Sequence, residues 1–163
     1  MSSKLLPIYL NDHLAGATAG ADLARRLAGS NEDEEDYGLP LSQVAREIEE
    51  DREALRTIMS RLGVGTDRAK QLLAWAAEKA GRLKLNGRLV SYSPLSRLEE
   101  LEMLALGVTG KRTLWLSLLL LVPHEESLST PELETLIGRA QEQLDTIETC
   151  RQRAILDAFP SRP

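Results

Sequence analysis

The sequence has little cysteine and few aromatic residues. Its 163 residues include one cysteine, Cys150, and only 4% are aromatic. A single cysteine leaves no partner for an intrachain disulfide and no second thiol for a Cys-x-x-Cys site, which agrees with a reducing cytoplasm. The apolar residues are instead mostly Leu and Ala, which favour helices over strands. We therefore expect an all-α, cytoplasmic protein, and the length suits a single domain over residues 1–163.

The sequence also lacks an excess of positive charge. Lys and Arg total 20 against 25 Asp and Glu, which gives a net charge of −5. The run Glu32 to Asp36 is wholly acidic, whereas the other charges of both signs are dispersed. The chain therefore lacks the basic patch that nucleic-acid binding requires. We expect the acidic run to be a solvated loop, with a patch for a partner or a metal as the alternative.

No apolar run is long enough to cross a bilayer. The longest, Leu114 to Val122, is about half the length that a transmembrane helix needs. The first thirteen residues also lack the basic, apolar and small-residue regions of a signal peptide. We therefore expect a soluble protein that does not act on membranes.

Several stretches have the apolar spacing of helices. The most apolar of them begins at Ser93, a residue type that caps helices, and Pro94, and it ends before Pro123. Its second half is apolar on almost every face, so other helices or a second copy of the chain must cover it. Asn86-Gly87 predicts a turn in the connection before it. The expected helices span about residues 5–28, 40–62, 66–83, 94–122 and 130–159.

Four of these stretches resemble an uncharacterised bacterial family of the ferritin-like superfamily. They read LNDHLAGATAGADLARRLA, EIEEDREALRTIMSRLGV, AWAAEKAGRLKLNGRL and SPLSRLEELEMLALGVTGK, and together they span most of residues 10–111. The resemblance implies an up-down, crossover, up-down four-helix bundle with a short helix in the crossover. The first two long helices would then be antiparallel neighbours, and so would the last two.

The metal ligands of active ferritin-like proteins are missing from this sequence. Those proteins hold two iron or manganese ions with a Glu on each of two helices and a Glu-x-x-His motif on each of the other two. The two histidines here, His13 and His124, do not follow a Glu at that spacing. We therefore expect no metal cofactor and no catalytic residue.

Five ionisable residues nevertheless fall on or near the predicted inward faces of the long helices, where an unpaired charge is costly. At about 100° per residue, Asp51 lies within the apolar stripe of its helix. One interpretation is a polar centre that holds a ligand, or an iron or manganese ion on His13, Asp51 and Glu102. The other is a buried salt-bridge network. The five residues are His13, Asp51, Glu102, Arg112 and Arg151.

Arg151 favours the network, because its fixed positive charge repels a divalent cation and can bind a carboxylate through two hydrogen bonds. Glu102 and Arg151 are about equally far from the loop that joins their helices. We therefore predict that they meet as an inward salt bridge.

An apolar surface is predicted on the fourth helix. Trp115, Leu118 and Leu121 lie away from the stripe assigned to the core of that helix. They would be covered by Trp75, acting as a lid from the shorter third helix, or they would drive formation of a homodimer.

These observations favour a non-enzymatic protein that acts as an interaction or structural protein, as a homodimer. One alternative is a metal-binding oxidoreductase of the same fold. Another is a small-molecule binding bundle, with its ligand where glycines thin the first and fourth helices. The sequence does not identify the cellular role.

Overall fold

The computed structural model describes residues 4–74 and 92–160, and every regular element within them is helical. The all-α prediction is confirmed, and the predicted bounds of the long helices are correct to within two residues. Residues 67–74 begin the expected shorter helix. Trp75 and the predicted turn at Asn86-Gly87 lie outside the described residues. The elements are α1 (Leu6–Ser30), α2 (Gly38–Arg61), α4 (Pro94–Leu121), the short 3-10 helix η1 (Val122–His124) and α5 (Thr130–Ala158).

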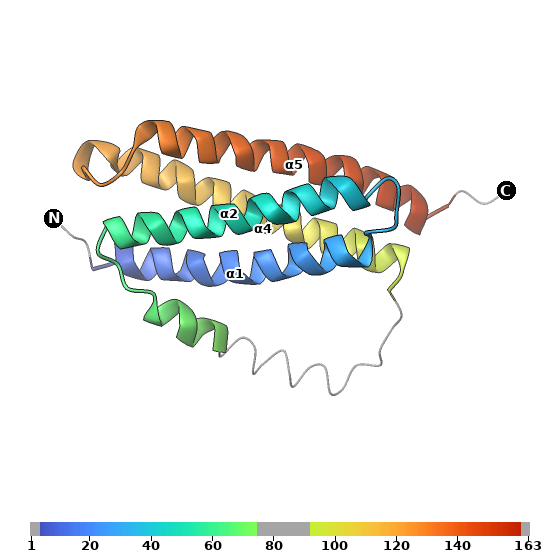
Figure 1. The fold of residues 1–163 in the computed structure, drawn as a ribbon, viewed down its shortest axis with the longest axis horizontal. Helices are drawn as coiled ribbons and strands as arrows, with labels where there is room; N and C mark the ends of the chain where they lie inside the picture. Colours follow the sequence, from blue (N-terminus) through green and yellow to red (C-terminus); the bar gives the residue numbers. More distant parts are fainter. Residues whose placement is uncertain (1–3, 75–91, 161–163) are drawn as a thin grey trace.

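The long helices lie side by side as two antiparallel pairs (Figure 1). α1 packs along α2, α4 packs along α5, and the pairs meet mainly through α1 and α4. Figure 1 also shows that α2 and α4 run in the same direction. The predicted neighbours are therefore correct, and the interior lies among all four helices.

Local signals explain where α4 and α5 begin. Ser93 Oγ accepts a hydrogen bond from the backbone N–H of Ser96 at 3.2 Å, and Pro94 opens α4, as predicted. At the start of α5 the N-cap residue is also a serine, Ser129, but its side chain makes no capping hydrogen bond. The start signals of α5 are Pro131 in the first turn, where a free N–H is not needed, and the acidic Glu132 beside it.

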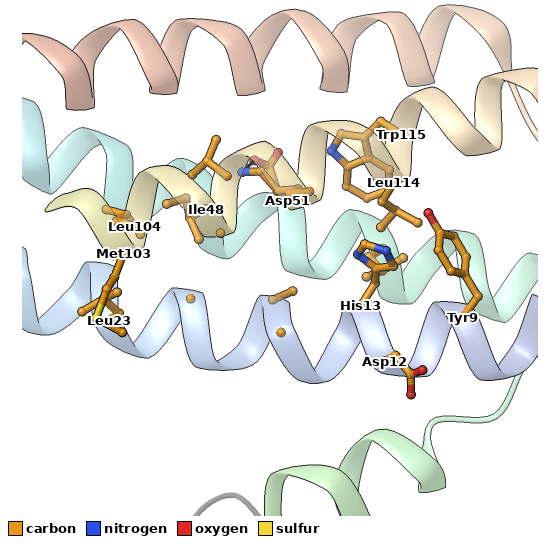
Figure 2. A pocket seen from close by; sticks show the side chains of 18 residues that line it. Tyr9, Asp12, His13, Leu23, Ile48, Asp51, Met103, Leu104, Leu114 and Trp115 are labelled. Atoms are coloured by element: carbon orange, nitrogen blue, oxygen red, sulfur yellow. Dashed lines mark hydrogen bonds and ion pairs between the residues drawn. The ribbon is translucent and has the colours of Figure 1, made fainter. Parts of the chain in front are cut away.

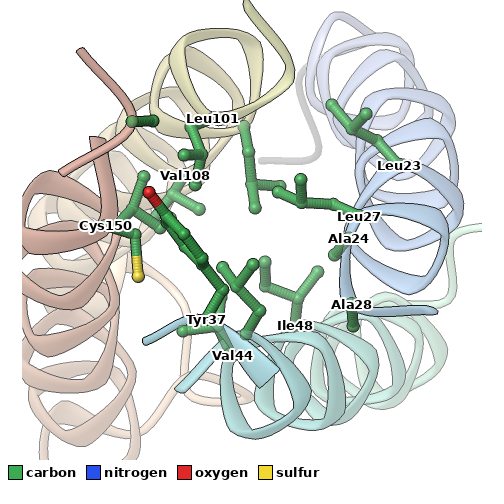
Figure 3. Close-up of a cluster of buried hydrophobic side chains, with 14 of the residues drawn as sticks. Leu23, Ala24, Leu27, Ala28, Tyr37, Val44, Ile48, Leu101, Val108 and Cys150 are labelled. Atoms are coloured by element: carbon green, nitrogen blue, oxygen red, sulfur yellow. The ribbon is translucent and has the colours of Figure 1, made fainter. Parts of the chain in front are cut away.

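The buried side chains form two clusters along the helices. One lies near the loop between α1 and α2 and includes Leu27, Tyr37 and Leu101 (Figure 3). The other lies toward the opposite end and includes Trp115 and Leu133. Full burial of a large apolar side chain contributes about 1.5–3 kcal/mol. The two clusters therefore supply most of the energy that holds the four helices together.

The predicted orientation of α4 is wrong. Trp115 and Leu118, expected on the outside, are 0% exposed, and Leu121 is partly buried against the same cluster. The outward leucines are Leu106 and Leu120, which are 74% and 79% exposed. The second half of α4 is apolar on nearly every face, so its pattern does not specify which face points inward.

α4 together with η1, Pro94–His124, is one helical segment that is long and apolar enough to cross a membrane by length and composition alone. Its most apolar window has a mean hydropathy of 1.4, and 22% of that window is buried. Lys111 and Arg112 lie near the middle of α4. The helix packs against α1 and α5 and leaves an apolar outer face.

Candidate functional site

The most deeply buried charge belongs to Asp51, on the inward face of α2. Its side chain is 0% exposed, and its carboxylate forms ion pairs with Lys111 of α4 and Arg139 of α5. Asp51 therefore joins three helices at one point. The prediction that Asp51 points inward and takes part in a salt-bridge network is correct.

Gln143 of α5 completes the contacts of this network. Its Nε2 donates to Asp51 Oδ2 at 3.1 Å and to Glu47 Oε2 at 3.3 Å. Its Oε1 accepts from Lys111 Nζ at 2.5 Å. A single amide thus bonds both members of the buried ion pair and replaces part of the hydration that Asp51 Oδ2 and Lys111 Nζ lose on burial.

The network lies between the two apolar clusters and connects outward at one edge. On α2 Asp51 lies between Ile48 of one cluster and Leu55 of the other. Arg139, which is partly exposed, also pairs with Glu50 at 3.0 Å. Arg139 therefore lies between two carboxylates, and the buried negative charge of Asp51 is balanced by cations of the chain.

Burial and pairing act in opposite directions on Lys111. Burial lowers the pKa of Lys111, whereas the neighbouring Asp51 carboxylate raises it by favouring the charged ammonium. A metal ion at Asp51 would have to displace two cations that are already in contact with the carboxylate. The network is therefore suited to holding helices together and poorly suited to binding a divalent cation.

Glu102 and Arg151 meet, but not in the interior. Arg151 Nη1 lies 3.7 Å from Glu102 Oε1, so the predicted pair exists. The Glu102 side chain is 53% exposed, however, and Arg151 makes closer contacts with Glu148 on its own helix, at 2.7 Å. The prediction of an inward salt bridge is therefore wrong. Glu102 points outward because the inward stripe of α4 runs through Leu101 and Leu104.

The five inward charges predicted from sequence do not form one site. Asp51 is inward, His13 is half-buried on α1, and Glu102 lies outside. Arg112 is partly buried and has no ion pair with any residue that the structure describes. Within residues 4–74 and 92–160, no group of three His, Cys, Asp or Glu side chains could hold a metal ion. The alternative metal set of His13, Asp51 and Glu102 is therefore not assembled.

Sequence reasoning missed Lys111, Arg139 and Gln143. Lys111 lies at helical spacing between the inward residues Val108 and Trp115, so a correct assignment of the inward face of α4 would have found it. Gln143 occupies the corresponding place on α5, between Ala140 and Ile147. Arg139 was not identifiable in this way, because its long side chain reaches Asp51 from the edge of the helix.

A pocket of about 390 Å³ lies between α1 and α4, with α2 as its floor (Figure 2). His13 and Asp51 both line it, and so does Trp115. The His13 ring packs edge-on against Tyr9, with 4.6 Å between the ring centroids. Burial lowers the pKa of His13, although Asp12 partly opposes this effect. We call this feature the α1–α4 pocket.

Four glycines form much of the pocket wall. A Cβ atom built on any of them would meet no neighbouring atom within 4 Å. No neighbouring helix therefore packs closely against these glycines. They leave space instead. They are Gly16 and Gly20 of α1 and Gly107 and Gly110 of α4.

A second polar cluster, centred on Arg97 of α4, was not predicted. The buried Arg97 guanidinium stacks on the Tyr37 ring at 4.2 Å and pairs with Asp157 at 3.2 Å. Its Nε donates to Asn31 at 2.5 Å. Tyr37 donates to the same Asp157 carboxylate at 2.6 Å, and burial first, with Asp157 second, raises the pKa of Tyr37 to about 12. This cluster ties the α1–α2 loop to α4 and α5.

The acidic loop is exposed, as predicted, and two of its carboxylates are paired. Glu34 lies 3.4 Å from Arg97, and Asp36 lies 2.9 Å from Arg153. Cys150 is a free, buried thiol whose pKa is raised, mainly by burial, which disfavours the reactive thiolate. Both features are thus accounted for by packing and ion pairing.

Comparison of the chain with family models, curated proteins and solved structures finds no match.

Proposed function

We propose that this chain is a non-enzymatic helical protein of the cytoplasm that acts through its surface as a homodimer. In this proposal the Asp51 network takes the place that a metal site has in ferritin-like proteins. The observation that carries the proposal is the state of the Asp51 carboxylate, which is fully buried and held by Lys111 and Arg139.

The arrangement of helices supports a ferritin-like topology. α1 and α2 are antiparallel neighbours, as are α4 and α5, and α2 and α4 run in the same direction. A chain that leaves α2 at one end and enters α4 at the other must pass along the length of the bundle between them. A connection of that kind is what distinguishes ferritin-like bundles from simple up-and-down ones.

The outer face of α4 supports a homodimer. Leu106 and Leu120 are fourteen residues apart, which at about 100° per residue places them on the same face of the helix, and Leu116 lies beside them. All three are exposed. Covering such a face with a second copy of itself would remove apolar surface from water on both copies. This face replaces the Trp115 and Leu118 surface that the sequence suggested.

Metal analysis tests the non-metal part of the proposal. The chain would be purified without chelator, its iron and manganese measured, and its melting temperature recorded with added Fe²⁺ or Mn²⁺. We expect no stoichiometric metal and no shift in melting temperature. Near-stoichiometric metal that is lost in Asp51→Asn but kept in the surface control Glu53→Gln would overturn the proposal.

Sedimentation analysis tests the dimer. We expect the chain to be dimeric at about ten micromolar, a range in which weak dimers form, and Leu106→Glu with Leu120→Glu to make it monomeric. Leu39→Glu, which changes an 82% exposed leucine on α2, is the matched control and should leave the dimer intact. A monomeric wild type, or a double variant that stays dimeric, would contradict the assignment.

A further inference from the structure

The α1–α4 pocket has the size and lining of a small-molecule site. Its volume of about 390 Å³ falls within the range of sites that hold small ligands. Leu104, Val108 and Leu114 form its apolar wall on α4, and Leu55 contributes from α2. Figure 2 shows that the pocket extends along α1 from Tyr9 and His13 at one end to Leu23 at the other. Its shape is therefore elongated.

Packing gives no reason for the glycines that open this pocket. A Cβ atom on Gly16, Gly20, Gly107 or Gly110 would enter open space, and alanine is more favourable than glycine inside a helix. Because these glycines have no side chains, the surfaces of α1 and α4 that line the pocket leave space between the two helices. The pocket thus exists at a cost to helix stability, which a bound molecule would offset.

The charges around the pocket are already balanced. Lys111 is paired with Asp51, and Asp12 lies 3.5 Å from Arg68. Burial holds the pKa of His13 below its ordinary value, which favours the neutral imidazole. A charged ligand would lose its hydration without meeting an unpaired charge of opposite sign. The lining therefore selects an uncharged molecule.

One buried hydrogen-bond donor in the pocket lining has no partner. Trp115 is 0% exposed, and its indole N–H makes no hydrogen bond within the part of the chain that the structure describes. Figure 2 shows the indole nitrogen on the edge of the ring that faces Asp51, another lining residue. Leaving a buried N–H unpaired is unfavourable, so an acceptor on a bound molecule would be stabilised there.

We propose that the α1–α4 pocket binds an uncharged, largely apolar small molecule whose hydrogen-bond acceptor meets the indole N–H of Trp115. This inference goes beyond the proposed function, because it stands whether or not the chain dimerises or lacks metal.

Fluorescent probes of similar size but different charge test the selectivity. Prodan is an uncharged naphthalene with a ketone acceptor, and anilinonaphthalene sulfonate is an anionic naphthalene. In the full-length Trp75→Phe variant, Trp115 is the only tryptophan. We expect Prodan to bind saturably with one site per chain and to quench Trp115, and the anion to bind at least about tenfold more weakly. No saturable Prodan binding, or equal binding of both probes, would overturn the proposal.

Two substitutions locate the site and the acceptor. Gly107→Leu fills the pocket and should weaken Prodan at least about tenfold, whereas Gly138→Leu, on an exposed helical glycine of α5, should not. Trp115→Phe removes the N–H and should weaken Prodan while leaving the binding of ethylnaphthalene, which has no acceptor, unchanged. Circular dichroism confirms that each variant is folded, and Gly110→Leu replaces Gly107→Leu if the latter does not fold. Equal Prodan affinity in the pocket and control variants would refute the site, and an unchanged affinity in Trp115→Phe would refute the acceptor.

Discussion

Replacing Asp51 with asparagine removes the negative charge at the centre of the network while keeping the shape of the side chain. Lys111 and Arg139 would then face each other in the interior without the carboxylate between them. Breaking a buried ion pair by removing one partner costs about 3–5 kcal/mol. Arg139 is partly exposed and keeps Glu50 as a partner, so we expect a loss near the lower end, about 3 kcal/mol.

Thermal and urea unfolding, followed by circular dichroism, would measure this loss. For a chain of this length, about 3 kcal/mol corresponds to a melting temperature lower by about 6–12 °C. The matched control is Glu53→Gln on the same helix, whose side chain is 54% exposed and pairs with Arg56 at 3.3 Å. An exposed pair contributes about 0–1 kcal/mol, so this variant should unfold close to wild type.

A double-mutant cycle separates the ion pair from other effects of the substitution. Lys111→Met removes the buried cation and keeps an apolar side chain of similar length. If Asp51 and Lys111 stabilise each other, the double variant should be more stable than the sum of the single changes predicts, by at least about 1 kcal/mol. A loss in Asp51→Asn no larger than in Glu53→Gln, or a coupling energy near zero, would refute the reasoning.

Three further predictions concern other residues. Gly20→Ala should raise the free energy of unfolding by about 0.5–1 kcal/mol, whereas Gly38→Ala should lower it in the same urea titration, because its Cβ would lie 2.5 Å from a backbone carbonyl oxygen; a destabilised Gly20→Ala would contradict the open pocket. Glu102→Gln should leave the melting temperature almost unchanged, since the pair with Arg151 is largely solvated; a large drop would restore the inward assignment. Because burial lowers the pKa of His13 below 6.5, the unfolded chain takes up a proton before the folded one. Stability should therefore fall as pH decreases below 6.5, less steeply in His13→Gln, and equal slopes in both proteins would count against this.

The sequence predicted the helices well because their apolar spacing is regular and some of their ends have clear signals. Ser93 and Pro94 begin α4, and Gly63, whose φ of 68° few other residues adopt, follows α2. α2 is apolar on one face only, so the inward position of Asp51 was also predictable. One-sided helices thus specify both their length and their orientation.

The site could be predicted only in part, because α4 is apolar on nearly every face. Several orientations then match the pattern almost equally well, and the chosen one placed Glu102 inward and Trp115 outward. Tertiary packing selects another orientation, which brings Lys111 to Asp51. The same error concealed the pocket, since helical glycines are compatible with close packing as well as with open space. Only the positions of neighbouring helices distinguish the two.

The central claim is that Lys111 and Arg139, and not a metal ion, bind the Asp51 carboxylate. Anomalous diffraction from crystals grown with Mn²⁺ tests this claim most directly. The account predicts electron density for Lys111 Nζ and the Arg139 guanidinium within hydrogen-bond distance of Asp51, and no anomalous peak beside that carboxylate. A manganese peak coordinated by Asp51, with Lys111 or Arg139 displaced, would contradict it.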